Sequence, residues 1–191
     1  MNRPVLKISY NAPVTLTFAL LCLLALALGA LTNGWTTSHL FSVYRSSLEP
    51  LAFFRFFGHV LGHGGLAHLV GNMGLLLVLG AGLEDRYGSG SLLLAILFTA
   101  LVSGVIHFVF FPGTVLLGAS GIVFMMILLS AFGGIKSGTI PLTLIFVIVL
   151  YLGGELWDAL FVQDDVSQLT HIIGGLCGTL IGFWRGAHYK G

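Results

Sequence analysis

Charged residues are scarce in this sequence: Asp, Glu, Lys and Arg make up 8% of its 191 residues. A soluble domain usually carries about 25%, so this class is excluded. Hydrophobic residues account for 57% and the mean hydropathy is +1.01. The net charge of +1, with no cluster of Lys and Arg, also excludes nucleic acid as a partner. We expect an integral membrane protein.

Cysteine is nearly absent, and glycine is abundant. The two cysteines, Cys22 and Cys177, lie in the middle of apolar runs, where neither is placed like a disulfide or a zinc ligand. We interpret both as small packing residues. The 27 glycines are costly in soluble helices, but in lipid they let helix backbones approach closely. Tight helix packing is therefore expected.

Six apolar runs divide the chain, at about residues 14–31, 66–82, 91–111, 115–132, 139–157 and 169–185. Each approaches the length that crosses a bilayer as a helix. A cleaved signal peptide is the alternative for the first run, but the run is long for one and no good cleavage site follows. We expect an all-α membrane protein, with residues 1–191 as one domain of six spans.

Residues 32–65, between the first two spans, mix aromatic side chains with Arg45 and Arg55. Rings and guanidinium stems bridge apolar and polar layers, which predicts an interfacial loop partly embedded in one leaflet. The second span is expected to end in a charged turn over residues 84–88.

Positive charges predict the orientation, because Lys and Arg in short loops stay in the cytoplasm. With both termini cytoplasmic, only Arg45 and Arg55 lie outside, and the loops before His68, Ser120 and His171 open to the outer side. Ser120 comes about five residues into its span, which predicts a depth of roughly 8 Å along the helix. The three polar residues should lie at similar depth.

Ser120 and His171 are a candidate nucleophile and base. A serine hydroxyl needs a base to react at neutral pH, and neutral imidazole can accept its proton. Glycines recur every four residues along the sixth span, at Gly174 and Gly178, on the face that carries His171. This face can pack against the fourth span at Gly118 and Gly121, which predicts a Ser-His dyad without an acidic third member.

His68 and Asn72 are four residues apart, so they lie on one helical face. With the Ser120 backbone N–H, they can donate hydrogen bonds to a developing oxyanion. Taken singly, a serine flanked by glycines is explained by packing, and an intramembrane His or Asn is often an interhelical hydrogen-bonding residue. Their conjunction in three spans favours acyl-transfer chemistry.

His59 and His63 precede this group, among glycines that suggest a loop. Their spacing would suit a pair of zinc ligands, but no Cys or acidic ligand accompanies them. We favour a polar lining that admits water, and we predict no metal site.

Together these segments resemble the rhomboid family of intramembrane serine proteases over residues 45–185. The matching motifs are His68 to Asn72, Gly118-Ala119-Ser120-Gly121, His171 to Gly174 with Gly178, and the segment from Gly82 to Gly90. The resemblance implies a rhomboid-like bundle with Ser120 as nucleophile, His171 as base, and an oxyanion hole of His68, Asn72 and Ser120. It also implies transmembrane protein substrates, no cofactor, and a gate formed by the fifth span and the loop after it.

One position departs from the family pattern: Phe124 stands where tyrosine is frequent. A phenyl ring can still stack on His171, so we expect little change in activity. The alternative to a protease is a catalytically inactive relative that binds membrane clients. We expect a multi-pass protein of a bacterial plasma membrane with the lipid bilayer as its environment, and the sequence leaves the oligomeric state open.

Overall fold

Helices dominate the computed structural model of this chain, which describes residues 9–132, 139, 142–147, 149 and 165–188. In chain order these are α1 (Pro13–Leu31), α2 (Trp35–His39), α3 (Pro50–Gly58), the 3-10 helix η1 (His59–Leu61), α4 (Leu66–Tyr87), α5 (Ser89–Phe110), α6 (Ser120–Phe132), α7 (Leu142–Val147) and α9 (Asp165–His188). The all-α prediction is therefore confirmed for the described residues.

Three of these helices, α1, α4 and α5, are long and apolar enough to cross a membrane. They correspond to the first three predicted spans. The apolar helices Ser120–Phe132 and Leu169–Gly182 are shorter and correspond to the fourth and sixth. Most of the predicted fifth span lies outside the described residues, where only α7 and two single positions are placed. The count of six spans stays a prediction.

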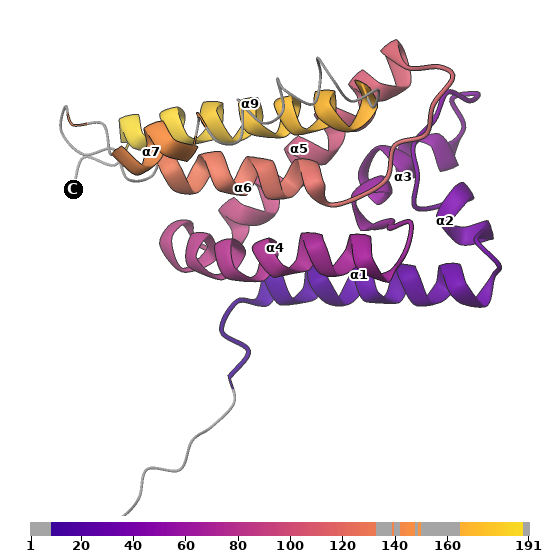
Figure 1. Cartoon of the computed structure of the whole chain (residues 1–191), viewed down its shortest axis with the longest axis horizontal. Coiled ribbons are helices and arrows are strands. Elements are labelled where there is room, and N and C mark those ends of the chain that lie inside the picture. Colours follow the sequence, from indigo (N-terminus) through magenta and orange to yellow (C-terminus); the bar gives the residue numbers. More distant parts are fainter. Residues whose placement is uncertain (1–8, 133–138, 140–141, 148, 150–164, 189–191) are drawn as a thin grey trace, which may run out of the picture.

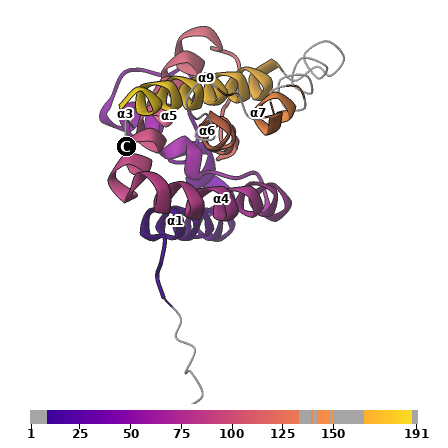
Figure 2. The same ribbon diagram turned by 90° about the vertical axis from the view of Figure 1, so that its left-hand side faces the viewer.

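The long helices pack in layers, with α1 against α4 and α6 against α9 (Figures 1 and 2). The core between them is made of fully buried apolar side chains, among them Leu69, Leu76, Ile122 and Met125. The first turns of α4, α6 and α9 lie at the same end of the molecule, beside α2 and α3 (Figure 1). The segments that carry His68, Ser120 and His171 thus begin on one side, as the loop assignments predicted.

The fourth predicted span begins later than expected. Residues 115–119 are not helical, and Ser120 is the first residue of α6. Leu116 instead forms an antiparallel bridge with Val43, with backbone N···O distances of 2.9 and 3.0 Å. The predicted depth of Ser120 within its helix was therefore wrong, because backbone hydrogen bonds to Val43, far away in the sequence, hold the preceding residues extended.

The predicted turn at residues 84–88 was also wrong, because α4 continues to Tyr87 and only Gly88 separates it from α5. Glu84 faces inward, where its carboxylate accepts hydrogen bonds from the N–H groups of Val14 (2.8 Å) and Thr15 (2.9 Å). The hydroxyls of Thr15 (2.8 Å) and Ser89 (2.7 Å) donate to it as well. One buried carboxylate thus caps α1 and ties it to α4 and α5.

The predicted interfacial loop is folded into α2, α3 and η1, joined by an extended stretch. Two arginines fasten this segment. Arg45 donates to the carbonyls of Phe108 (2.7 Å) and Val109 (2.6 Å) near the C-terminal end of α5, and Arg55 donates to the His39 carbonyl (2.7 Å). Both arginines had been assigned only an interfacial role, and the structure shows that they also close the fold.

Replacing Glu84 by alanine should destabilise the protein by about 3 kcal/mol, because buried N–H and hydroxyl donors would lose a charged acceptor. Thermal unfolding of the purified protein in detergent measures the effect. The neighbouring Asp85 is exposed on the same helix, so Asp85→Ala is the matched control and should leave the midpoint unchanged. Equal effects of the two substitutions would contradict the capping role of Glu84.

Candidate active site

The contact between α6 and α9 depends on glycines of α9. A Cβ added at Gly174 would collide with the Gly121 carbonyl, and one added at Gly178 would collide with the Met125 carbonyl. Backbone therefore meets backbone at two successive turns of the helix pair. The glycine pattern along the sixth predicted span indicated this packing.

His171 lies beside the first turns of α6. Its ring stacks on that of Phe124, with centroids 4.2 Å apart and planes inclined by 6°. Thr170, the residue before His171, also contacts α6: its Cγ2 atom lies 3.0 Å from the ideal Cβ position of Gly121. Phe124 is one turn after Ser120, and Thr170 directly precedes His171. Ser120 and His171 therefore both lie within one helical turn of residues that form the contact between α6 and α9. Thr170 was not singled out from the sequence, although its place before His171 could have suggested it.

Gly118 has a different neighbour from the one predicted. Its φ of +128° is favourable only for glycine, and its ideal Cβ position lies 3.0 Å from both Cε1 and Nε2 of His68. Gly118 therefore packs against the second predicted span rather than the sixth. Its N–H donates to the His59 carbonyl (3.0 Å), which fixes the backbone two residues before Ser120.

The contacts of His68 indicate which of its ring nitrogens carries the proton. The Gly64 N–H donates to His68 Nδ1 at 3.5 Å, so in the neutral ring this bond assigns the proton to Nε2. Nε2 lies against Gly118 together with Cε1. His68 thus presents an N–H toward the segment that leads into Ser120.

Asn72, one turn after His68, is 8% exposed. Its Nδ2 atom is buried and has no hydrogen-bond partner among the described residues. A buried amide donor without an acceptor costs about 1–3 kcal/mol, and native structures retain few such groups. The helical geometry places this donor on the same face of α4 as His68. Both residues therefore carry polar groups on one face of α4, as their spacing predicted.

His59 and His63 are both buried, and they differ in setting. His63 lies in the predicted loop, where Nδ1 donates to the Leu61 carbonyl (3.1 Å) and the ring packs edge-on against His68. His59 lies in η1 instead of a loop, and its Nε2 faces the Ala100 carbonyl (3.1 Å). Burial lowers the pKa of each ring to about 4, so both are neutral at pH 7.

Each of these two histidines keeps one buried ring nitrogen without a hydrogen-bond partner in the described part of the chain, His59 Nδ1 and His63 Nε2. That feature is compatible with the predicted polar lining for water. For the metal alternative, the described residues contain no group of three or more His, Cys, Asp or Glu that could hold an ion.

Comparisons with known proteins give one family. The family model described as "Rhomboid domain" matches residues 50–188. "Rhomboid protease GlpG" of Serratia proteamaculans (strain 568) is 27% identical over 184 residues, covering 94% of this chain and 65% of the relative. "Rhomboid-related protein 2" of Mus musculus is 30% identical over 145 residues, covering 68% and 47%. The chain therefore spans less than two thirds of the length of these relatives.

Gly178→Ala should lower the thermal unfolding midpoint, because the new methyl group would push α9 away from the Met125 carbonyl. Gly175→Ala is the matched control in the same helix, since its added Cβ would meet only Leu128 side-chain atoms at 3.8 and 3.9 Å. The control should be neutral or slightly stabilising, because alanine favours helices by up to about 1 kcal/mol over glycine. A Gly178→Ala protein as stable as Gly175→Ala would refute the close approach.

Proposed function

Because this chain belongs to the rhomboid family, we propose that it is an intramembrane serine endopeptidase. Its substrates are transmembrane or juxtamembrane segments of other membrane proteins. The relatives named as proteases support this proposal, and so do the helices that are long and apolar enough to span a bilayer. No nucleic acid takes part.

The observation that carries the proposal is the unpaired buried donor of Asn72. Together with the Nε2–H of His68, it suits an oxygen atom that gains negative charge during a reaction. Such an oxyanion arises when a hydroxyl attacks a peptide carbonyl. The backbone N–H of Ser120, at the start of α6, is the third donor of this proposed oxyanion hole. A purely structural amide would have been expected to find a partner in the protein.

In the proposed reaction, Ser120 Oγ attacks the scissile carbonyl while His171 accepts the hydroxyl proton. His171 then passes this proton to the leaving amine, and the peptide C–N bond breaks to give an acyl-enzyme. Water hydrolyses the ester, with His171 acting as base a second time, and Ser120 is regenerated. The ring stack with Phe124 (4.2 Å) supports His171 in this role, because it restricts rotation of the imidazole.

The proposed topology has both termini in the cytoplasm of a bacterium and the site open to the outer side of the plasma membrane. Two observations support it. The predicted cytoplasmic segments contain more Lys and Arg residues than the predicted outer segments. The first turns of α4, α6 and α9 also lie at one end of the molecule (Figure 1). A substrate would reach Ser120 from that end.

Ser120→Ala and His171→Ala should each abolish cleavage of a transmembrane reporter by the purified protein, because the nucleophile or its base is lost. A fluorophosphonate probe should label the wild-type protein and fail to label Ser120→Ala. Both variants should keep the wild-type thermal midpoint, which separates lost chemistry from lost folding. Absence of labelling in a folded wild-type protein would instead favour the alternative function, a catalytically inactive relative that binds membrane clients.

Phe124→Ala should lower kcat more than it raises KM, because it removes the ring that orients His171. Phe124→Tyr retains the stack and should change turnover by only a few-fold. Thermal midpoints measured in parallel show whether a lower kcat comes from the lost ring stack or from a destabilised fold. A rise in turnover of about a hundredfold for Phe124→Tyr, equal to about 2.7 kcal/mol, would show that a phenolic hydroxyl matters here after all.

A further inference from the structure

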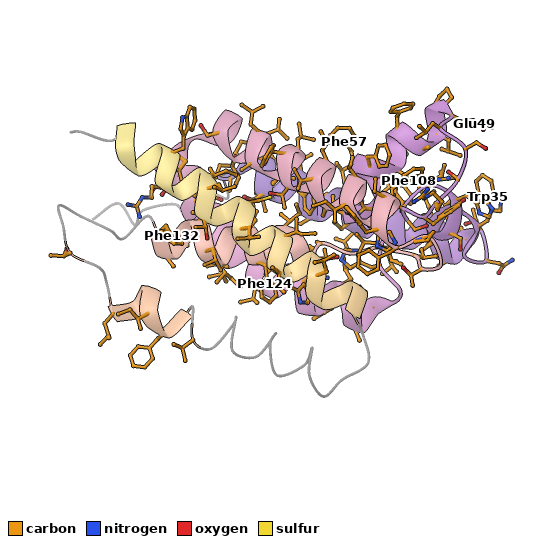
Figure 3. All side chains as sticks on the ribbon, turned by 90° about the horizontal axis from the view of Figure 1, so that it is seen from above. Trp35, Glu49, Phe57, Phe108, Phe124 and Phe132 are labelled. Atoms are coloured by element: carbon orange, nitrogen blue, oxygen red, sulfur yellow. The ribbon has the colours of Figure 1, made fainter. Side chains whose placement is uncertain are left out.

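A second polar site lies in the segment between α1 and α4, away from Ser120. It is a surface pocket of about 190 Å³ at the start of α3, lined by Tyr44, Ser46, Ser47, Glu49, Leu51, Ala52 and Arg55. In Figure 3, Glu49 lies at one end of the molecule directly before α3, and Phe57 lies farther along that helix. None of the residues given a role in the proposed proteolysis lines this pocket.

Arg55 gives the pocket a positive charge that forms no ion pair with a carboxylate in the described part of the chain. The residue is 6% exposed, and in the described structure no carboxylate lies within 4.0 Å of its guanidinium. Nε donates to the His39 carbonyl (2.7 Å), Nη1 faces the Ser46 hydroxyl (3.3 Å), and the group stacks over the Tyr44 ring at 4.4 Å. A guanidinium has five N–H donors, and the two hydrogen bonds to His39 and Ser46 use two of them.

The other polar groups of the pocket limit what an anionic ligand can be. The Ser47 side chain suits phosphate oxygens, which bind well to arginine and hydroxyl donors. The Ser46 hydroxyl instead donates to the Ser47 carbonyl (3.2 Å) and holds the Arg55 guanidinium. Glu49, however, is exposed at the rim, and its carboxylate would repel an inorganic phosphate dianion. The pair of opposite charges instead suits a ligand that carries a phosphate and an amine.

The surface around the pocket indicates where such a ligand comes from. Along α3, Phe53, Phe54 and Phe57 are 56%, 47% and 40% exposed, and Leu48 and Leu51 beside the pocket are also exposed. Phenylalanines in a helix that carries a buried arginine are typical of a segment at the lipid interface. Acyl chains can cover this apolar face while their headgroup reaches the pocket.

We propose that this pocket binds the headgroup of a zwitterionic aminophospholipid of the phosphatidylethanolamine type. The phosphodiester accepts hydrogen bonds from Arg55 and the Ser47 hydroxyl, and the ammonium group lies near Glu49. The acyl chains follow the exposed side of α3. The bound lipid supplies the anion that Arg55 lacks and anchors the segment between α1 and α4 to one leaflet.

The test uses the full-length protein in detergent and dioctanoyl phosphatidylethanolamine as the probe, with binding measured by native mass spectrometry and by the shift in thermal midpoint. Dioctanoyl phosphatidylglycerol, which has the phosphate but no amine, should bind about fivefold more weakly, since a rim ion pair contributes at most about 1 kcal/mol. Equal binding of the two lipids would overturn the assignment of the amine to Glu49.

Variants separate the contributions. Glu49→Gln should reduce the preference between the two lipids to less than about twofold, whereas Asp85→Asn, the same charge change at a distant exposed position, should leave the preference intact. Arg55→Lys and Ser47→Ala should weaken both lipids, because each removes donors to the shared phosphate. If Arg55→Lys has a lowered midpoint without lipid, Ser47→Ala and Glu49→Gln decide the question. A preference that survives Glu49→Gln would refute the proposal.

Two soluble probes distinguish the lipid from its parts. Glycerophosphoethanolamine and inorganic phosphate share the phosphate but lack acyl chains, so both should bind much more weakly than the lipid. Equal binding of either one would show a phosphate site that does not need a membrane lipid, and would refute the proposed role of α3. These measurements do not depend on proteolysis, and they can be repeated in Ser120→Ala protein.

Discussion

The missing side chains of Gly174 and Gly178 are the constraint on which the candidate site depends. They let α9 touch the backbone of α6 at Gly121 and Met125, and no other residue type permits that distance. The short distance between the two helices also sets the distances between their facing side chains, including the ring stack of Phe124 on His171. In a bilayer, where lipid tails compete with apolar side chains for contact, such backbone packing is an effective way to specify one arrangement.

A second constraint acts along the chain and not across it. The segment before Ser120 is held by the bridge between Val43 and Leu116 and by the bond from Gly118 to the His59 carbonyl. These contacts keep the residues before Ser120 extended, so that α6 begins directly at Ser120. They also bring Gly118 against His68. The two constraints together gather groups from α4, α6 and α9 without any ion pair or metal in the proposed chemistry.

Much of this arrangement could be predicted from sequence, for identifiable reasons. Apolar runs and glycine spacing are local patterns, so α1, α4, α5 and the contact of α9 with α6 follow from them. The start of α6 could not be predicted, because Val115 to Ala119 are as apolar as the helical residues that follow them. Only Val43, which is distant in the sequence, holds this segment extended. Glu84 is similar: a charged residue after an apolar run suggests a turn, and only the donors on α1 explain its burial inside α4.

The segment between α1 and α4 has a mechanical consequence. It is joined to α5 through Arg45, to Leu116 through Val43, and to Gly118 through the His59 carbonyl. To swing this flank of the molecule outward, several hydrogen bonds would have to break together, some of them out of reach of water. We expect this flank to resist outward movement, so that a large molecule entering the proposed active site meets less resistance along another side.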